Sequence, residues 1–241
     1  VIAGDGLGSG AVVYDLLTDV NLAGTTTVAS LTVTGDIDVD GTSNLDVIDV
    51  DGAANFAADV TFADGADIIT ASAGTSNFRA GVNAGNSIES GGNYNVVVGD
   101  EAGTAITTGD NNVGVGYNSL AANTTGSNNA GVGRQSLLSN TTGASNSAFG
   151  STALDANTTG DYNTALGQAS LSANTTADNN TGVGYRALAV NTTGTFNTAV
   201  GNNAGDAITT GGRNIAIGSS ALTADTVGSR AVAIGYEALA T

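Results

Sequence analysis

The chain has 241 residues and a formal net charge of −17, with 36 glycines and no Pro, Cys, Met, Trp or His. All five basic residues are arginines, so lysine is absent as well. These absences exclude disulfide scaffolds, zinc sites and nucleophilic catalysis by His, Cys or Lys. The acidic charge argues against nucleic acid or an anionic membrane as a partner, because both recruit basic patches.

No apolar run approaches the roughly 20 residues that a membrane helix needs, so we expect no membrane insertion. The chain starts at Val1 rather than methionine and ends at Thr241 inside a repeat, which indicates a segment of a longer chain. Paired carboxylates remain available for catalysis, as in glycoside hydrolases. Because acidic residues of the repeats are scattered among variable positions, as on solvated faces, we predict no enzymatic activity and no cofactor.

The first 76 residues carry twelve Asp and no basic residue. Residues 1–28, which begin V-I-A-G-D-G-L-G-S-G, form the predicted N-terminal connector. From residue 29 to residue 76, apolar residues alternate with Thr, Asp and Ser between glycines, which predicts half-buried strands joined by turns. We therefore predict an acidic β-shaft over residues 29–76, whose short strands interleave with copies of themselves.

One stretch of this shaft is a candidate metal site. Asp36, Asp38 and Asp40, followed by Gly41, match the D-x-D-x-D-G opening of a calcium loop. The twelfth position, which should be Glu, is Val47. The residues between the aspartates are apolar, so a strand with an acidic outer face explains the pattern better. Weak calcium binding stays an alternative.

From Asn77 onward one short pattern recurs about ten times, with a glycine every 17 residues after a first step of 18. An uninterrupted period of this size is typical of a solenoid, in which each repeat forms one coil. We predict an all-β fold, with a fibrous parallel β-roll or β-solenoid of 17-residue coils over residues 77–241. Ten coils at a strand spacing of about 4.8 Å would make a rod of roughly 45–50 Å. These repeated glycines are Gly81, Gly99, Gly116, Gly133, Gly150, Gly167, Gly184, Gly201, Gly218 and Gly235.

Several positions of the coil keep the same residue type in most repeats. An apolar residue precedes each glycine from Gly99 onward, Asn stands four places before it in most coils, and Leu usually stands four places after it. In three coils the Leu position holds glycine and an isoleucine appears three residues later, as in Gly103 and Ile106. Close-packed cores tolerate neither a void nor a surplus, so both positions should face one narrow interior. Coils then stack in register, and their asparagines should form hydrogen-bonded ladders.

Three further features concern the surface. Small residues two places before the glycine should permit close approach of another chain, which favours a homotrimer; examples are Ala148, Ala165, Ala199 and Ala216. The N-T-T triplets fit the N-glycosylation sequon but are better explained as a turn residue before strand formers; they begin at Asn123, Asn140, Asn157, Asn174 and Asn191. The aromatic residues expected to be exposed, in a variable outer column that could contact glycans, are Tyr117, Tyr185 and Tyr236.

The repeats resemble the head repeats of trimeric autotransporter adhesins, whose motif runs roughly N-S-V-A-I-G-x-x-S-x-A. The matching segments are N-I-A-I-G-S-S-A from Asn214 to Ala221 and A-V-A-I-G from Ala231 to Gly235. That family's coil is shorter, and the N-T-T-G segment accounts for the difference. Longer repeats of this kind, and the opening and L-T-V-T-G-D-I-D-V-D-G stretches, are similar to tail-fibre sequences of tailed bacteriophages.

These resemblances imply a structural attachment fibre of a tailed phage, located in the virion and acting as a rigid trimeric spacer. The implied partner is a cell-surface glycan or protein receptor. The alternative is a bacterial trimeric adhesin exposed at the cell surface, and a polysaccharide-cleaving enzyme is a more distant one. A spacer role also agrees with the expectation that solvent-facing positions vary without clustering aromatic or charged residues.

Overall fold

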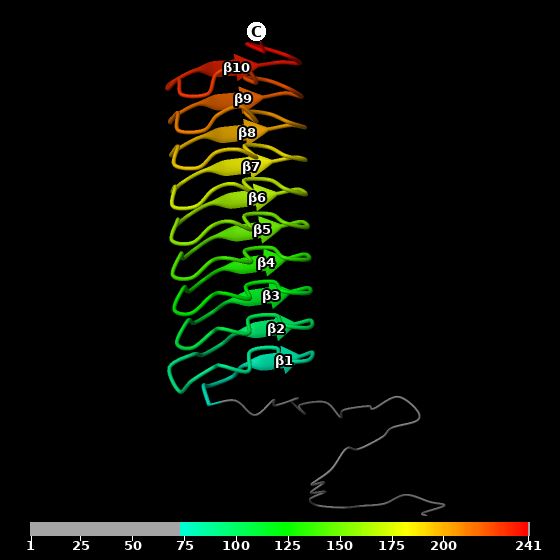
Figure 1. Cartoon of the computed structure of the whole chain (residues 1–241), viewed down its shortest axis with the longest axis vertical. Helices are drawn as coiled ribbons and strands as arrows, with labels where there is room; N and C mark the ends of the chain where they lie inside the picture. The colour runs from blue at the N-terminus through cyan, green and yellow to red at the C-terminus, as the bar shows by residue number, and fades with distance from the viewer. Residues whose placement is uncertain (1–72, 241) are drawn as a thin grey trace, which may run out of the picture. The chain divides into compact units, whose positions relative to one another are not determined.

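The computed structural model describes residues 73–240, and every regular element among them is a β-strand. Ten strands form one parallel sheet in which each pairs with the next in sequence order, one above another (Figure 1). This is a parallel β-solenoid of about nine turns. The described residues contain no helix that could span a lipid bilayer. The strands are β1 (Phe78–Ala80), β2 (Val96–Val98), β3 (Val113–Val115), β4 (Ala130–Val132), β5 (Ser147–Phe149), β6 (Thr164–Leu166), β7 (Thr181–Val183), β8 (Thr198–Val200), β9 (Ile215–Ile217) and β10 (Val232–Ile234).

The strand register reproduces the sequence repeat. Paired residues are 18 positions apart between β1 and β2, as in Phe78 and Val96, and 17 apart afterwards, as in Val96 and Val113. Equivalent residues of successive coils therefore lie directly above one another. Nine steps at about 4.8 Å place β10 about 43 Å from β1. The predicted connector and the predicted shaft up to residue 72 lie outside the described residues.

Each strand is only three residues long because a glycine ends it. These strand glycines have φ between 125° and 139°, a region that L-residues rarely adopt. They also allow close stacking: a Cβ on Gly116 would lie 2.7 Å from the carbonyl oxygen of Gly133 in the next coil. The glycine column thus meets two requirements, a sharp corner and close approach of neighbouring coils.

The middle residue of each strand points into the coil, and its small size fits a narrow interior. Ala148, Ala165, Ala199 and Ala216 are at most 1 % exposed. The expectation that these small residues admit another chain is therefore wrong. They pack against the leucine column of their own chain, so they are not available to a partner chain.

The interior is filled by the leucine column, the residues four places after each strand glycine. Leu120, Leu137, Leu154, Leu171 and Leu188 are fully buried and belong to one core cluster. Every leucine of the column has φ between 51° and 56°, the left-handed region that costs a non-glycine residue about 1–2 kcal/mol. Burial of the side chain must offset this backbone cost.

The exchange of leucine for glycine plus isoleucine is confirmed. Ile88, Ile106 and Ile208 are buried. A Cβ added at Gly103 would lie 2.8 Å from Cδ1 of Ile106, so the isoleucine occupies the space that leucine fills in other coils. Gly103 has φ of 57°, so glycine also adopts this left-handed position at no steric cost.

Two asparagine ladders run through the stack, as the repeated columns predict. The strand asparagines precede the strands: the Oδ1 of Asn146 accepts a hydrogen bond from the backbone N–H of Asn163 at 2.9 Å, and its Nδ2 donates to the Gly160 carbonyl at 2.8 Å. The turn asparagines open the N-T-T triplets: Nδ2 of Asn157 donates to Oδ1 of Asn140 at 2.7 Å and to the same Gly160 carbonyl at 3.0 Å. In every coil that has a turn asparagine, both ladders donate to the same turn carbonyl, which connects the turn to the strand.

Replacing Asn146 with alanine should lower the free energy of unfolding by about 1–3 kcal/mol, the cost of one unsatisfied buried group. The backbone N–H of Asn163 loses its acceptor, whereas the Gly160 carbonyl keeps its bond to Asn157. Urea unfolding measures this difference. The control Asn202→Ala removes an exposed amide and should change the free energy by less than about 0.5 kcal/mol. Equal effects of both variants would contradict a structural role for the ladder.

Candidate functional site

The metal-binding candidates from the sequence do not lie in the described part of the chain. Asp36, Asp38 and Asp40 lie outside it. Within residues 73–240, no group of three or more His, Cys, Asp or Glu side chains is placed to hold a metal ion. We therefore looked for function on the surfaces of the coils.

Two half-buried carboxyl groups have perturbed acidity but do not form a catalytic pair. Burial raises the pKa of Asp155 above its usual value. Burial also raises the pKa of Asp206, partly offset by the nearby charge of Arg186. The two aspartates are three coils apart, about 14 Å at a strand spacing of about 4.8 Å. Carboxyl pairs of glycoside hydrolases are about 5–9.5 Å apart.

Two stacked aspartates, Asp161 and Asp178, accept hydrogen bonds from backbone N–H groups of the preceding coil. The Oδ1 of Asp178 accepts a hydrogen bond from the backbone N–H of Asp161 in the coil before it, at 2.8 Å. Asp161 accepts the backbone N–H of Ala144 in the same way at 2.7 Å. These carboxylates close the turn before each strand, which explains their position without a catalytic role.

The N-T-T triplets are structural, in agreement with the interpretation favoured from the sequence. All five turn asparagines are fully buried. Their Nδ2 atoms donate to protein acceptors, as Asn140 does to Asn123 at 2.7 Å and to Gly143 at 2.9 Å. A glycan cannot be attached to a side chain in this position while the coils stay folded.

The predicted exposed tyrosines are exposed but dispersed. Tyr117, Tyr185 and Tyr236 are 48 %, 47 % and 75 % exposed. They share one column after the strand glycine, yet at least two other coils separate any two of them. The side chain of Glu237, through a hydrogen bond and its charge, raises the pKa of the Tyr236 phenol above its usual value. No common binding surface joins these three rings.

A long uncharged face covers the outside of the sheet, and it is apolar except for Ser147, Thr164, Thr181 and Thr198. It consists of the first and third residue of every strand from β1 to β10, and we call it the outer face. Phe149, Leu166 and Ile217 on it are 42 %, 49 % and 38 % exposed, and none of its twenty positions carries a charged residue. Soluble monomers rarely expose contiguous apolar patches larger than a few hundred Å². The outer face therefore fits an interface better than a solvated surface.

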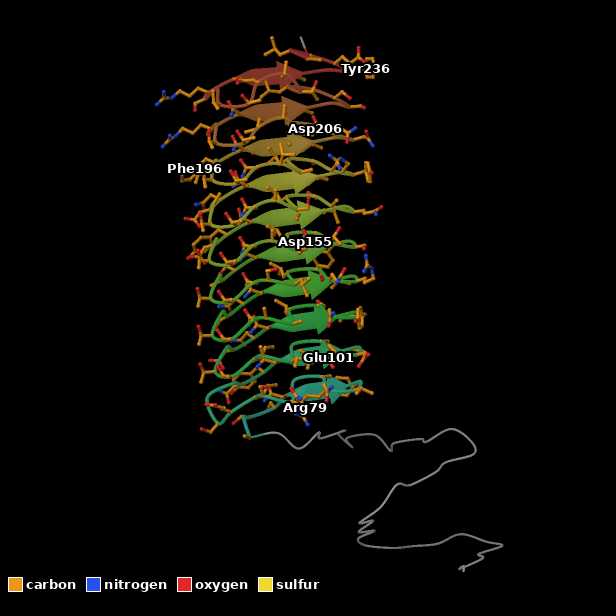
Figure 2. All side chains as sticks on the ribbon, viewed as in Figure 1. Arg79, Glu101, Asp155, Phe196, Asp206 and Tyr236 are labelled. Carbon is orange, nitrogen blue, oxygen red and sulfur yellow. The ribbon has the colours of Figure 1, made fainter. Side chains whose placement is uncertain are left out.

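A second surface follows one edge of the stack. We call the residues two places before the start of strands β2 to β10 the edge column: Tyr94, Asn111, Asn128, Ser145, Tyr162, Asn179, Phe196, Arg213 and Arg230. All have φ between 57° and 65°. Figure 2 shows Phe196 pointing away from the stack, on the edge opposite Tyr236. The guanidinium carbon of Arg213 lies 5.5 Å from the centre of the Phe196 ring.

This edge corrects the expectation that no aromatic or charged residues cluster on the coils. Phe196, Arg213 and Arg230 occupy the same place in three consecutive coils. The sequence carries this signal, because Phe196, Arg213 and Arg230 are spaced 17 residues apart, one repeat each.

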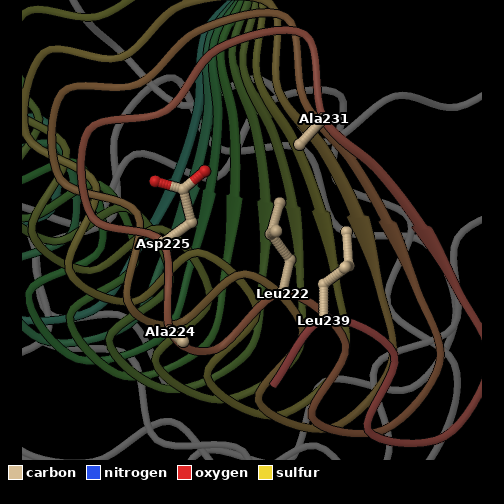
Figure 3. Close-up of a pocket in the computed structure, with 5 residues that line it drawn as sticks. All are labelled: Leu222, Ala224, Asp225, Ala231 and Leu239. Carbon is tan, nitrogen blue, oxygen red and sulfur yellow. The ribbon is translucent and has the colours of Figure 1, made fainter. Parts of the chain in front are cut away.

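One hollow of about 350 Å³ lies at the last described coils, lined by Leu222, Ala224, Asp225, Ala231 and Leu239 (Figure 3). Leu222 is 2 % exposed, whereas Leu239 in the outermost coil is 56 % exposed. Asp225 stands where other coils have a turn asparagine, and its Oδ1 accepts the backbone N–H of Gly228 at 2.6 Å. The hollow is the interior of a coil that no further described coil covers.

The comparisons with known proteins leave the family open. A scan against protein-family models, a search of curated proteins and a search of solved structures found no match.

Proposed function

We propose that this chain is part of a structural attachment fibre of a tailed phage, in which the solenoid is a rigid homotrimeric spacer. The supporting observation is the outer face, an uncharged and largely apolar strip along ten consecutive strands. Stiffness follows from the stack, because each coil is hydrogen-bonded to its neighbours along its whole length. A spacer needs this combination of length and rigidity.

The partner that fits the outer face is another copy of the chain. The apolar residues recur at the strand spacing, so a complementary surface must repeat at the same interval over about 43 Å. A second solenoid of the same sequence has this periodicity. Three copies with their sheets turned toward a common axis would cover all three outer faces.

The same architecture would serve a bacterial surface adhesin. The phage assignment is favoured by the resemblance of the opening and shaft stretches to tail-fibre sequences, and those stretches lie outside the described residues. In either setting the solenoid holds a receptor-binding group at a distance from the anchored end.

Trimer formation can be tested with a matched pair of charge changes. Leu166→Glu places a carboxylate on the outer face, and Gln168→Glu places one on an exposed position outside it, in the same coil. Burying an unpaired charge is strongly unfavourable. Sedimentation at micromolar concentration should therefore show a trimer for the wild type and Gln168→Glu, and dissociation for Leu166→Glu. A folded wild-type monomer under these conditions would contradict the proposal.

A further inference from the structure

The fold does not explain all of the residue types in the edge column. Left-handed φ values near 60° suit asparagine, which fills the column at Asn111, Asn128 and Asn179. Phe196 takes the same backbone conformation with a bulky ring that is 52 % exposed. The chain therefore accepts backbone cost and exposed apolar surface at a place where asparagine was available.

The charge of this edge also changes along the stack. The position just before the edge column is acidic in earlier coils, at Asp110, Asp161 and Asp178. In the last three described coils it holds Thr195, Gly212 and Ser229, none of which is acidic. A basic surface at this end stands out in a chain with a net charge of −17.

Arg213 and Arg230 carry this positive charge. Among residues 73–240 neither guanidinium has an ion pair or a hydrogen bond to another side chain, and Arg213 instead stacks on the Phe196 ring. The backbone N–H of Arg230 donates to the Gly212 carbonyl at 3.1 Å, which puts the two arginines in register on adjacent coils. Like charges directly opposite each other on neighbouring strands are destabilising. The pair therefore gains from an anion placed near both guanidinium groups.

We propose that Phe196, Arg213 and Arg230 bind an acidic sugar unit of a cell-surface polysaccharide. Two guanidinium groups on adjacent coils match a carboxylate or sulfate group, to which each can donate charge-assisted hydrogen bonds. The Phe196 ring holds the Arg213 guanidinium in place by the cation–π contact and offers apolar surface to the sugar ring. The proposal rests on the attachment role in naming a cell-surface ligand, and the site itself rests on the three residues.

The size of the basic surface separates this ligand from other polyanions. Double-stranded DNA carries one charge per about 1.7 Å, and an anionic membrane presents an extended negative plane. Both would meet the acidic positions on the earlier coils of the same edge, at Asp161 and Asp178. An acidic polysaccharide is a flexible single chain, so it can place one carboxylate at the arginine pair and cross the edge without following it to the aspartates.

The test measures retention of the whole chain on immobilised alginate, a polyuronate, with dextran as the neutral glucan. The variant Arg213→Asn/Arg230→Asn introduces the residue that the edge column holds elsewhere, so it should fold. The matched control Arg134→Asn/Arg186→Asn removes the same charge from the opposite edge, where Asn202 and Asn203 show that asparagine fits the same columns. Phe196→Asn tests the ring.

Wild type and control should bind alginate and not dextran. Affinity should fall at least about tenfold for each of Arg213 and Arg230 removed, the effect of losing one charge-assisted hydrogen bond. It should fall less for Phe196→Asn. Equal loss in the control, or no wild-type binding to alginate, would overturn the proposal. Equal binding to vesicles of anionic phospholipid would overturn the assignment to a sugar.

Alginate binding and the proposed fibre role can be tested independently. A chain that sediments as a monomer but binds alginate through Arg213 and Arg230 keeps this site and contradicts the trimeric spacer. A trimer that does not bind alginate keeps the spacer and contradicts the site.

Discussion

Replacing Leu154 with glycine should lower the free energy of unfolding by about 2–5 kcal/mol, the range for large-to-small changes in a core. Leu154 is fully buried and belongs to the main core cluster. Its φ of 52° means that glycine also relieves backbone strain, by about 1 kcal/mol. Leu154→Ala keeps that strain, so it should be no more stable than Leu154→Gly although alanine is larger. Denaturant unfolding of both variants gives the comparison.

A second substitution should restore part of the loss. Leu154→Gly/Asn157→Ile copies the arrangement of Gly103 and Ile106, in which the isoleucine fills the interior from three residues later. The rescue is partial because Asn157 is bonded on both sides, to Asn140 at 2.7 Å and from Asn174 at 3.0 Å. A double variant no more stable than Leu154→Gly would contradict the idea of one shared interior.

The rescue should be larger at the end of the ladder. Asn191 bonds to Asn174 on one side at 3.1 Å, and the next coil already has Ile208 in its place. Leu188→Gly/Asn191→Ile therefore cuts the turn-asparagine ladder on one side only. The coils that naturally hold Ile106 and Ile208 lie at the two ends of the turn-asparagine ladder. An isoleucine at either end interrupts the ladder on one side only, which agrees with the expected difference in stability.

Deleting residues 129–162 should leave a folded trimer shorter by about 10 Å, two strand spacings. The deletion removes β4 and β5 and joins Asn128 to Asn163, which replaces one strand asparagine by another in the same column. Deleting only residues 129–138 shifts every later column and brings Asn140, Thr141 and Thr142 to the place of a strand. This shift should abolish cooperative unfolding of the solenoid, because small, leucine and glycine columns no longer match their neighbours.

The in-register deletion also tests the spacer role. It leaves Phe196, Arg213 and Arg230 in place, so attachment of particles carrying the shortened fibre should persist. Electron microscopy measures the length and a surface-binding assay measures attachment. Loss of attachment by a correctly assembled trimer would show that the deleted coils hold the receptor site.

Part of the fold follows from the sequence because the repeats of this one chain can be compared with one another. The recurring glycine predicted the turns and the coil-to-coil register, and the exchange of Leu for Gly and Ile predicted a shared narrow interior. The constant asparagines predicted the ladders. Each inference needed only the rule that like residues stack on like, and the strand pairing obeys that rule.

The sequence did not determine which side of each strand faces inward. In a strand such as Ala148 between Ser147 and Phe149, the interior residue is the smaller apolar one, because Leu154 already fills the coil. The size of these side chains therefore led to a wrong prediction of the interface. The column of small residues is inside, and the large apolar residues lie on the outer face. In the edge column, the 17-residue spacing places Phe196 and Arg213 at equivalent positions of neighbouring coils. Only the tertiary structure showed that the Arg213 guanidinium lies 5.5 Å from the centre of the Phe196 ring, because that contact depends on how the coils stack.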